Sequence, residues 1–241
     1  MRVKAMEQRL IREEMLLGEA AVEKLQNSHV AVFGLGGVGS WCAEALARSG
    51  VGTLTLIDQD KVGMSNINRQ LCALSSTVGK AKAEVMAARI CDINPNIRVI
   101  PIVGTYREEE RESFFADYDY AADAIDLVKN KVDLIRTCRE RHIPILSALG
   151  TGNKKDAAQL QITDISKTYG CALARVVRRE LRKIGIEHLD VVFSPEEPME
   201  PTQVEAPPPG RRSVPGSLVW VPATAGLLMA QKIVTELSKA E

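Results

Sequence analysis

The 241-residue sequence has few cysteines, few aromatic residues and no excess of charge of either sign. Its five cysteines, Cys42, Cys72, Cys91, Cys138 and Cys171, form no C-x-x-C pair, which argues against a zinc knot or a secreted disulfide framework. Lysine and arginine together number 31, as do aspartate and glutamate. No global field therefore attracts nucleic acid, and any polyanion site must be a local patch.

The sequence also lacks an apolar run of the kind that crosses a membrane. Residues 1–18 are charged throughout and contain no apolar core of signal-peptide type, so a cytoplasmic protein is expected. Polar residues and a proline interrupt the apolar stretch 218–234. This pattern favours a buried strand followed by a helix over a membrane span, and peripheral membrane contact is the alternative of lower weight.

A glycine-rich turn is the most informative feature. The apolar run 29–33 (HVAVF) leads into GLGGVGS at residues 34–40 and then into a helix-like segment. This is the order of a strand, a phosphate-binding turn and a helix. Gly34 permits the tight turn, Gly36 and its neighbour Gly37 let the backbone approach a phosphate, and Gly39 lets the helix pack close to the strand.

An acidic residue follows at the position that a nucleotide site requires. The second apolar run, residues 53–57 (TLTLI), ends at Asp58, where a carboxylate should meet a ribose hydroxyl. A plain glycine turn beside a solvated aspartate is the competing interpretation, and the spacing argues against it. The motif itself does not distinguish NAD from ATP.

Two further polar segments follow Asp58. Residues 59–70 are too long for a plain turn and carry Asn66 and Arg69, which could contact phosphate oxygens or belong to a capped surface loop. Lys80 and Lys82 then open a helix pattern that runs to about residue 93. Lysines at a helix start oppose the helix dipole, so an anion is expected there.

Asp126 is the candidate magnesium ligand. Residues 120–126 (YAADAID) read as a fourth strand that ends in carboxylates. A carboxylate beyond the carboxyl edge of a parallel strand can hold Mg²⁺ on a triphosphate. The alternative is that Asp126 caps the following helix, which is predicted over residues 127–141.

The alternation of strands and helices predicts an α/β fold with a doubly wound, mainly parallel sheet. Further strands are expected at residues 98–103 and 143–149. Residues 1–150 form the nucleotide-binding region, and residues 151–241 form an elaborated region of the same domain for substrate binding and dimerisation. The segment 194–216 is rich in proline and is predicted to be a flexible loop.

A basic helix over residues 170–183 is the concentrated positive feature of the chain. Most such runs are solvated helix faces, but beside a nucleotide crevice this one predicts contact with an RNA backbone, at an affinity that falls with salt. The candidate contacts are Lys154, Lys155, Arg175, Arg178, Arg179 and Arg182.

The ordered set of motifs resembles the adenylating domain of the E1-like superfamily. The motifs are GLGGVGS (34–40), DQD (58–60), SNINRQ (65–70), VGKAK (78–82), INP (93–95) and DAID (123–126). The resemblance implies MgATP as the nucleotide and transfer of AMP onto a carboxylate. It places Asp58 on the ribose with Asp60 beside it, Asn66, Arg69 and Lys82 on the phosphates, and Asp126 on Mg²⁺.

Arg12 gains a role through the same resemblance. From the residues alone, Arg12 reads as part of a solvated helix face within an amphipathic segment at residues 7–25 that is broken by Gly18. It resembles the arginine that family members insert into the active site of the partner subunit. The resemblance therefore implies a homodimer in which Arg12, Arg69, Lys82 and Asp126 are catalytic.

Within the superfamily, the sequence is most similar to the tRNA threonylcarbamoyladenosine dehydratases, through WCAEALARSG (41–50), LARVVRRE (173–180) and GSLVWVPATAG (216–226). This similarity implies ATP-dependent cyclisation of the modified adenosine at position 37 of tRNA, with a cysteine desulfurase or sulfur-acceptor protein as an optional partner. The alternative is adenylation of a ubiquitin-like sulfur carrier, as in ThiF-like and MoeB-like enzymes. Those enzymes usually carry paired C-x-x-C motifs, which are absent here.

Cys171 stands at the start of the basic helix, where a thiolate would be stabilised. Relatives that form thioesters use a cysteine downstream of the first half of the fold. The cyclisation requires no cysteine, so Cys171→Ser is expected to keep full activity.

Overall fold

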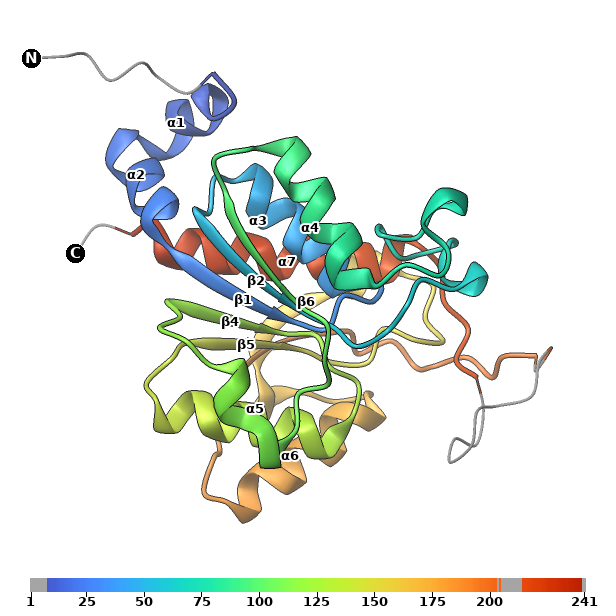
Figure 1. Cartoon of the computed structure of the whole chain (residues 1–241). Coiled ribbons are helices and arrows are strands. Elements are labelled where there is room, and N and C mark those ends of the chain that lie inside the picture. Colours follow the sequence, from blue (N-terminus) through green and yellow to red (C-terminus); the bar gives the residue numbers. More distant parts are fainter. Residues whose placement is uncertain (1–7, 203, 205–213, 240–241) are drawn as a thin grey trace, which may run out of the picture.

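The computed structural model describes residues 8–202, 204 and 214–239, which build one seven-stranded sheet between two layers of helices (Figure 1). The strand order is β3-β2-β1-β4-β5-β7-β6. Every neighbouring pair is parallel except β6 and β7, which are antiparallel. The predicted doubly wound, mainly parallel sheet is confirmed. The strands are β1 (His29–Phe33), β2 (Thr53–Ile57), β3 (Arg98–Ile102), β4 (Tyr120–Asp123), β5 (Ile145–Ala148), β6 (Gln161–Asp164) and β7 (Asp190–Phe193).

The sheet is covered on both faces, as a parallel sheet must be. Alternate residues of β1 enter two separate cores: Val30 and Val32 pack on one side, Ala31 and Phe33 on the other. The first core lies under α2 (Glu19–Asn27), α3 (Gly39–Arg48), α4 (Lys82–Ile93) and α7 (Trp220–Leu237), and the second under α5 (Val128–Glu140) and α6 (Ala172–Lys183) (Figure 1).

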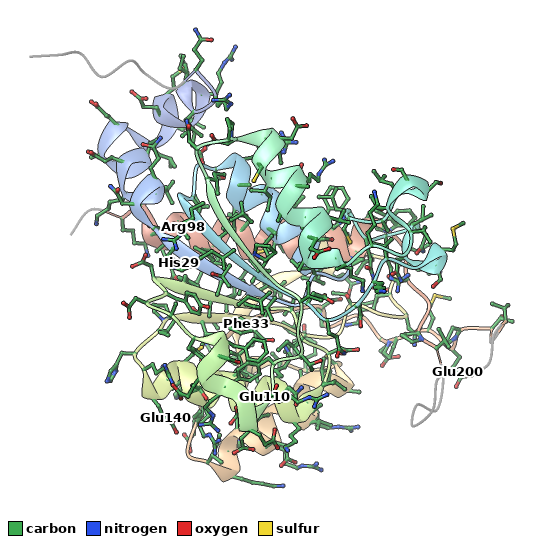
Figure 2. All side chains as sticks on the ribbon, in the orientation of Figure 1. His29, Phe33, Arg98, Glu110, Glu140 and Glu200 are labelled. Atoms are coloured by element: carbon green, nitrogen blue, oxygen red, sulfur yellow. The ribbon has the colours of Figure 1, made fainter. Side chains whose placement is uncertain are left out.

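Aromatic side chains fill part of the second core. Phe33 lies near the centre of the molecule (Figure 2), with its ring edge-on to Tyr106 at 5.6 Å between centroids. Tyr106 precedes the 3-10 segment η3 (Glu108–Phe114), Phe114 ends it, and the centroids of their rings lie 5.7 Å apart. The other 3-10 segments are η1 (Met64–Asn66), η2 (Ser75–Thr77), η4 (Ala157–Gln159) and η5 (Ile165–Lys167).

The amino-terminal segment forms two short helices that meet at Gly18, as predicted. The first, α1 (Ile11–Leu17), has no buried residue, and its side chains Met15 and Leu16 are 73% and 87% exposed. Leu10, just before α1, packs on Gly50 in the turn that leads into β2. The helix therefore lies at the amino end of β2, next to the edge that His29 and Arg98 mark in Figure 2.

The carboxyl-terminal segment departs from the prediction. The strand predicted at the start of the apolar stretch 218–234 does not form, and the stretch leads directly into α7, which spans 18 residues. Pro222 lies in the first helical turn, where its missing N–H costs no hydrogen bond. Gly226 packs against α3 so closely that a Cβ would lie 2.3 Å from the carbonyl oxygen of Val38. The apolar residues of this segment therefore pack against a helix and the sheet face, and form no extra strand.

Both halves of the chain contribute to the same sheet, because β6 and β7 of the second half continue it beyond β5. The proline-rich segment predicted to be a loop lies partly outside the described residues, at positions 203 and 205–213. In the described part of the chain, no helix has both the length and the apolar composition needed to cross a bilayer.

Candidate active site

A crevice of about 1040 Å³ opens at the carboxyl ends of β1, β2, β4 and β5. The strand order reverses between β1 and β4, and ligands of open α/β sheets bind at this kind of switch point. The loops after all four strands line the crevice, and Pro215, Gly216, Ser217 and Pro222 close it from the second half of the chain. Its size is at the upper end of the range for small-molecule sites, which extends to roughly 1,000 Å³.

The glycine turn forms one wall of the crevice. Gly34 has a φ of 89°, which favours glycine, and a Cβ there would lie 2.8 Å from the carbonyl oxygen of Ala124. A Cβ on Gly39 would lie only 1.8 Å from the carbonyl oxygen of Gly34. Gly36 is different, because the nearest atom to its Cβ would be Gln70 Nε2 at 3.9 Å. The turn and helix packing thus require Gly34 and Gly39, whereas Gly36 faces the space that a ligand would fill.

Asp58 is held rigidly at the end of β2. Its Oδ2 accepts a hydrogen bond from the backbone N–H of Leu35 at 2.6 Å, and its Oδ1 accepts one from that of Asp60 at 2.7 Å. Burial raises the pKa of Asp58, although these two hydrogen bonds and the nearby Lys82 oppose the shift. The carboxylate is fixed against the glycine turn, where the sequence predicted a ribose contact.

Lys82 and Asp60 form an ion pair at the crevice. Lys82 Nζ lies 3.0 Å from Asp60 Oδ2, and the Lys82 side chain is 5% exposed, compared with 57% for Asp60. The Lys82 N–H also donates to the carbonyl oxygen of Asp60 at 2.9 Å, at the start of α4. Asp60, predicted beside the nucleotide, lines the crevice and fixes the Lys82 ammonium there.

Asn66 is the last residue of η1, and Arg69 follows it in the next loop. Asn66 Oδ1 accepts a hydrogen bond from the N–H of Gly63, so this side chain stabilises its own loop. Arg69 Nη1 donates to the carbonyl oxygen of Ser65 and to Asn68 Oδ1. Burial lowers the pKa of Arg69 below its ordinary value. Both residues line the crevice together with Lys82.

The two carboxylates of the DAID motif have different environments. Asp123, the last residue of β4, is completely buried and paired with Lys131. Asp126 is exposed and lines the crevice. Helix α5 begins at Val128 with Leu127 as its N-cap residue, so Asp126 is not the helix cap. A crevice-facing carboxylate suits Mg²⁺, which binds through one or two carboxylates together with substrate phosphates.

The predicted RNA contacts require a correction. Lys154 is buried and its Nζ donates to the carbonyl oxygen of Ser194. Arg178 is half-buried and its Nη1 donates to Thr168. Both side chains donate hydrogen bonds to oxygen atoms inside the fold, so neither belongs to an RNA-facing surface. The exposed residues of the set are Lys155, Arg175, Arg179 and Arg182, and Arg179 is paired with Glu180.

Cys171 and Arg12 lie in contrasting positions. Cys171 is buried as the N-cap residue of α6, where its Sγ accepts from the N–H of Ala174 at 3.5 Å. Arg12 is exposed on α1, at the amino end of β2. The strand of five residues alone spans roughly 16 Å, so Arg12 lies far from the crevice of its own chain.

Sequence reasoning missed two residues of the site. Gln70 is buried and lines the crevice, and it closes the SNINRQ motif, so the motif could have identified it. Lys131 supports the crevice from within α5, and no spacing in the sequence links it to Asp123. Only the fold brings the two together.

Known proteins resemble this chain over nearly its whole length. The chain is 46% identical to the tRNA threonylcarbamoyladenosine dehydratase of Bacillus subtilis, with 95% of this chain and 94% of the relative covered. A crystal structure of the Escherichia coli tRNA N6-threonylcarbamoyladenosine dehydratase in complex with ATP superposes with a TM-score of 0.87 at 38% identity, covering 97% of this chain and 95% of the other.

A second kind of relative is more distant. The molybdopterin-synthase adenylyltransferase of Escherichia coli is 32% identical over 62% of this chain and 60% of its own length. The model of the ThiF family matches residues 8–241. The chain therefore belongs to the ThiF family.

Proposed function

We propose that this protein catalyses the ATP-dependent dehydration of N6-threonylcarbamoyladenosine at position 37 of tRNA to its cyclic form. The observation that carries the proposal is the single crevice in which the glycine turn, Asp58, Lys82 and Asp126 meet. The full-length similarity to the dehydratases, compared with the partial similarity to the adenylyltransferase, supports tRNA as the substrate.

The first step is adenylation of the substrate. The threonyl carboxylate attacks the α-phosphorus of ATP and expels pyrophosphate, which leaves an acyl adenylate. Asp58 orients the ribose, because two backbone hydrogen bonds already fix its carboxylate. Lys82 and Arg69 stabilise the negative charge that develops on the phosphates. Mg²⁺ held by Asp126 would, when bound, neutralise further phosphate charge.

The second step closes the ring. The carbamoyl nitrogen of the same nucleoside attacks the activated carbonyl carbon, the bond from that carbon to the AMP oxygen breaks, and the nitrogen loses its proton. Both reacting groups belong to one nucleoside, so their positioning supplies much of the acceleration. This step needs no thiol, in keeping with the buried position of Cys171.

A homodimer completes the site in this proposal. Arg12 lies too far from the crevice of its own chain to act there, and α1 exposes Met15 and Leu16 beside it. Apolar side chains on a helix without buried residues suit a subunit interface. We infer that α1 of one subunit brings Arg12 to the crevice of the partner.

The tRNA is proposed to approach along the exposed basic residues of α6 and along Lys155, which lies in the loop between β5 and η4. Arg175, Arg179 and Arg182 lie on the solvent side of the helix, and Lys155 precedes it. Phosphate contacts of this kind position an RNA without reading its sequence.

Mass spectrometry of the RNA tests the function. The pure protein is incubated with MgATP and tRNA that carries the modified adenosine, and the digested nucleosides are analysed. The proposal expects loss of one water from the modified nucleoside together with AMP and pyrophosphate. If no mass change occurs, and pyrophosphate exchange requires a carrier protein ending in Gly-Gly, the protein is instead an activating enzyme for a sulfur carrier.

A further inference from the structure

One buried lysine joins the two strand ends beneath the crevice. The side chains of Lys131 and Asp123 are both 0% exposed. Lys131 Nζ lies 2.6 Å from Asp123 Oδ2 and 3.0 Å from the carbonyl oxygen of Ala148. Asp123 ends β4 and Ala148 ends β5. A single ammonium group of α5 therefore holds the ends of two neighbouring strands.

Each of these strand ends leads directly into a loop of the crevice. Asp123 Oδ1 accepts a hydrogen bond from the N–H of Ile125 at 3.0 Å, and Ile125 precedes Asp126. Ala148 precedes residues 149–152, which line the other side of the crevice. A displacement of Lys131 or Asp123 would therefore move the backbone that carries Asp126.

The buried polar cluster is poorly explained as a source of stability. Removing two charges from water costs about as much as their attraction returns, so well-packed apolar residues often serve a core equally well. Ser147, the cross-strand neighbour of Asp123, adds a buried hydroxyl without a hydrogen-bond partner among the described residues. Three polar side chains occupy a place between α5 and the sheet where apolar ones would pack.

We propose that Lys131 is a positioning residue for the magnesium-binding side of the site. Through Asp123 and the carbonyl of Ala148, its ammonium fixes residues 124–127 so that the Asp126 carboxylate faces the nucleotide phosphates. The same ion pair holds the Asp123 carboxylate in the core, so that only one carboxylate of the motif reaches the crevice. This inference rests on the proposed function in taking ATP as the nucleotide and Asp126 as the magnesium ligand.

The test uses the double variant Asp123→Asn/Lys131→Met, which removes both charges and leaves no uncompensated ion. ATP binding is measured by calorimetry with and without Mg²⁺, in the absence of RNA. Affinity for metal-free ATP should stay within about twofold, because the glycine turn and Asp58 are unchanged. Affinity for MgATP should fall about 10- to 100-fold, the usual effect of removing an outer-shell partner of a metal ligand.

Two matched variants control for the substitution itself. Lys129→Met changes an exposed lysine of the same helix, two positions before Lys131, and should alter neither affinity. Ser147→Ala removes the unpaired hydroxyl from the same buried cluster and should raise the thermal stability without changing MgATP binding. The two controls distinguish the effect of removing a polar group near the site from the effect of displacing the loop that carries Asp126.

The proposal would be overturned if the double variant melted at the wild-type temperature and Mg²⁺ raised its affinity for ATP as much as it does in the wild type. If the double variant fails to fold, Asp123→Asn/Lys131→Gln makes the same comparison without a buried charge, because its glutamine is one atom shorter than lysine and cannot span both oxygens. An unchanged MgATP affinity in that variant would overturn the proposal equally. The readout requires no tRNA, so it stays valid if the dehydration assay fails.

Discussion

The glycine turn meets two requirements: Gly39 lets α3 pack closely, and Gly36 leaves space for a phosphate. Replacing each glycine with alanine should separate these two requirements. A methyl group on Gly39 would lie 1.8 Å from the carbonyl oxygen of Gly34, whereas contacts below 3.0 Å essentially never occur. Either α3 or the turn must then move by more than about 1 Å, and overpacking of this kind costs about 1–3 kcal/mol. For a chain of this size, each kcal/mol lowers the melting temperature by roughly 2–4 °C.

Gly36→Ala should behave in the opposite way. Its methyl group meets no atom closer than 3.9 Å, so the fold should melt within about 2 °C of the wild type. The methyl group would instead occupy the space that a phosphate approaches. We expect the dissociation constant for MgATP to rise at least about tenfold, which corresponds to about 1.4 kcal/mol.

Calorimetry of ATP binding and thermal melts of the two variants measure both effects side by side. Gly39→Ala should lose stability first and ATP affinity as a consequence, and Gly36→Ala should lose affinity alone. Wild-type ATP affinity in Gly36→Ala would refute the phosphate-binding role of the turn.

Three further predictions follow from the site. Mixing subunits of the inactive variants Arg12→Ala and Asp126→Ala should restore about a quarter of the wild-type activity, because half of the random dimers are mixed and each holds one intact site; no recovery would place Arg12 in its own chain's site. Burial raises the pKa of Asp58, so its carboxylate should be protonated at a higher pH than that of an ordinary aspartate. ATP affinity should therefore be lost as the pH falls through the raised pKa, and calorimetry at a series of pH values measures this loss. Arg179→Ala should reduce the salt slope of tRNA binding by about one, whereas Arg178→Ala should lower the melting temperature, and the reverse result would contradict the assignment of these two surfaces.

The sequence predicted the first five strands because local signals specify them. The glycine turn, the apolar runs and the acidic residue after β2 each act within a few residues, and all of them indicate a parallel nucleotide-binding sheet. The start of the apolar stretch 218–234 was predicted wrongly as a strand. A short apolar run has the same pattern in a buried strand and a buried helix, and here the contact of Gly226 with α3 decides between them.

The site residues that belong to sequence motifs could be predicted. Residues whose role depends on whether the fold buries their side chains could not. Composition shows that α6 is basic, but only the fold shows that Arg178 satisfies the carbonyl oxygen of Thr168. The sequence does contain one signal for this: positions 174, 177 and 181 are apolar, and they are buried in the structure. Position 178 lies four residues after 174 and therefore on the same, inward-facing side of the helix. The pairing of Lys131 with Asp123 joins a helix to a strand end, and no local pattern encodes it.

Oxygen transfer tests the central claim, adenylation of the substrate carboxylate, most directly. The tRNA substrate is prepared with oxygen-18 in the threonyl carboxylate, and the nucleotide products are analysed by mass spectrometry after one turnover. Because a carboxylate oxygen attacks the α-phosphorus and leaves with AMP when the ring closes, the account predicts one labelled oxygen in the phosphate of AMP. Label in inorganic phosphate, with ADP as the nucleotide product, would contradict it.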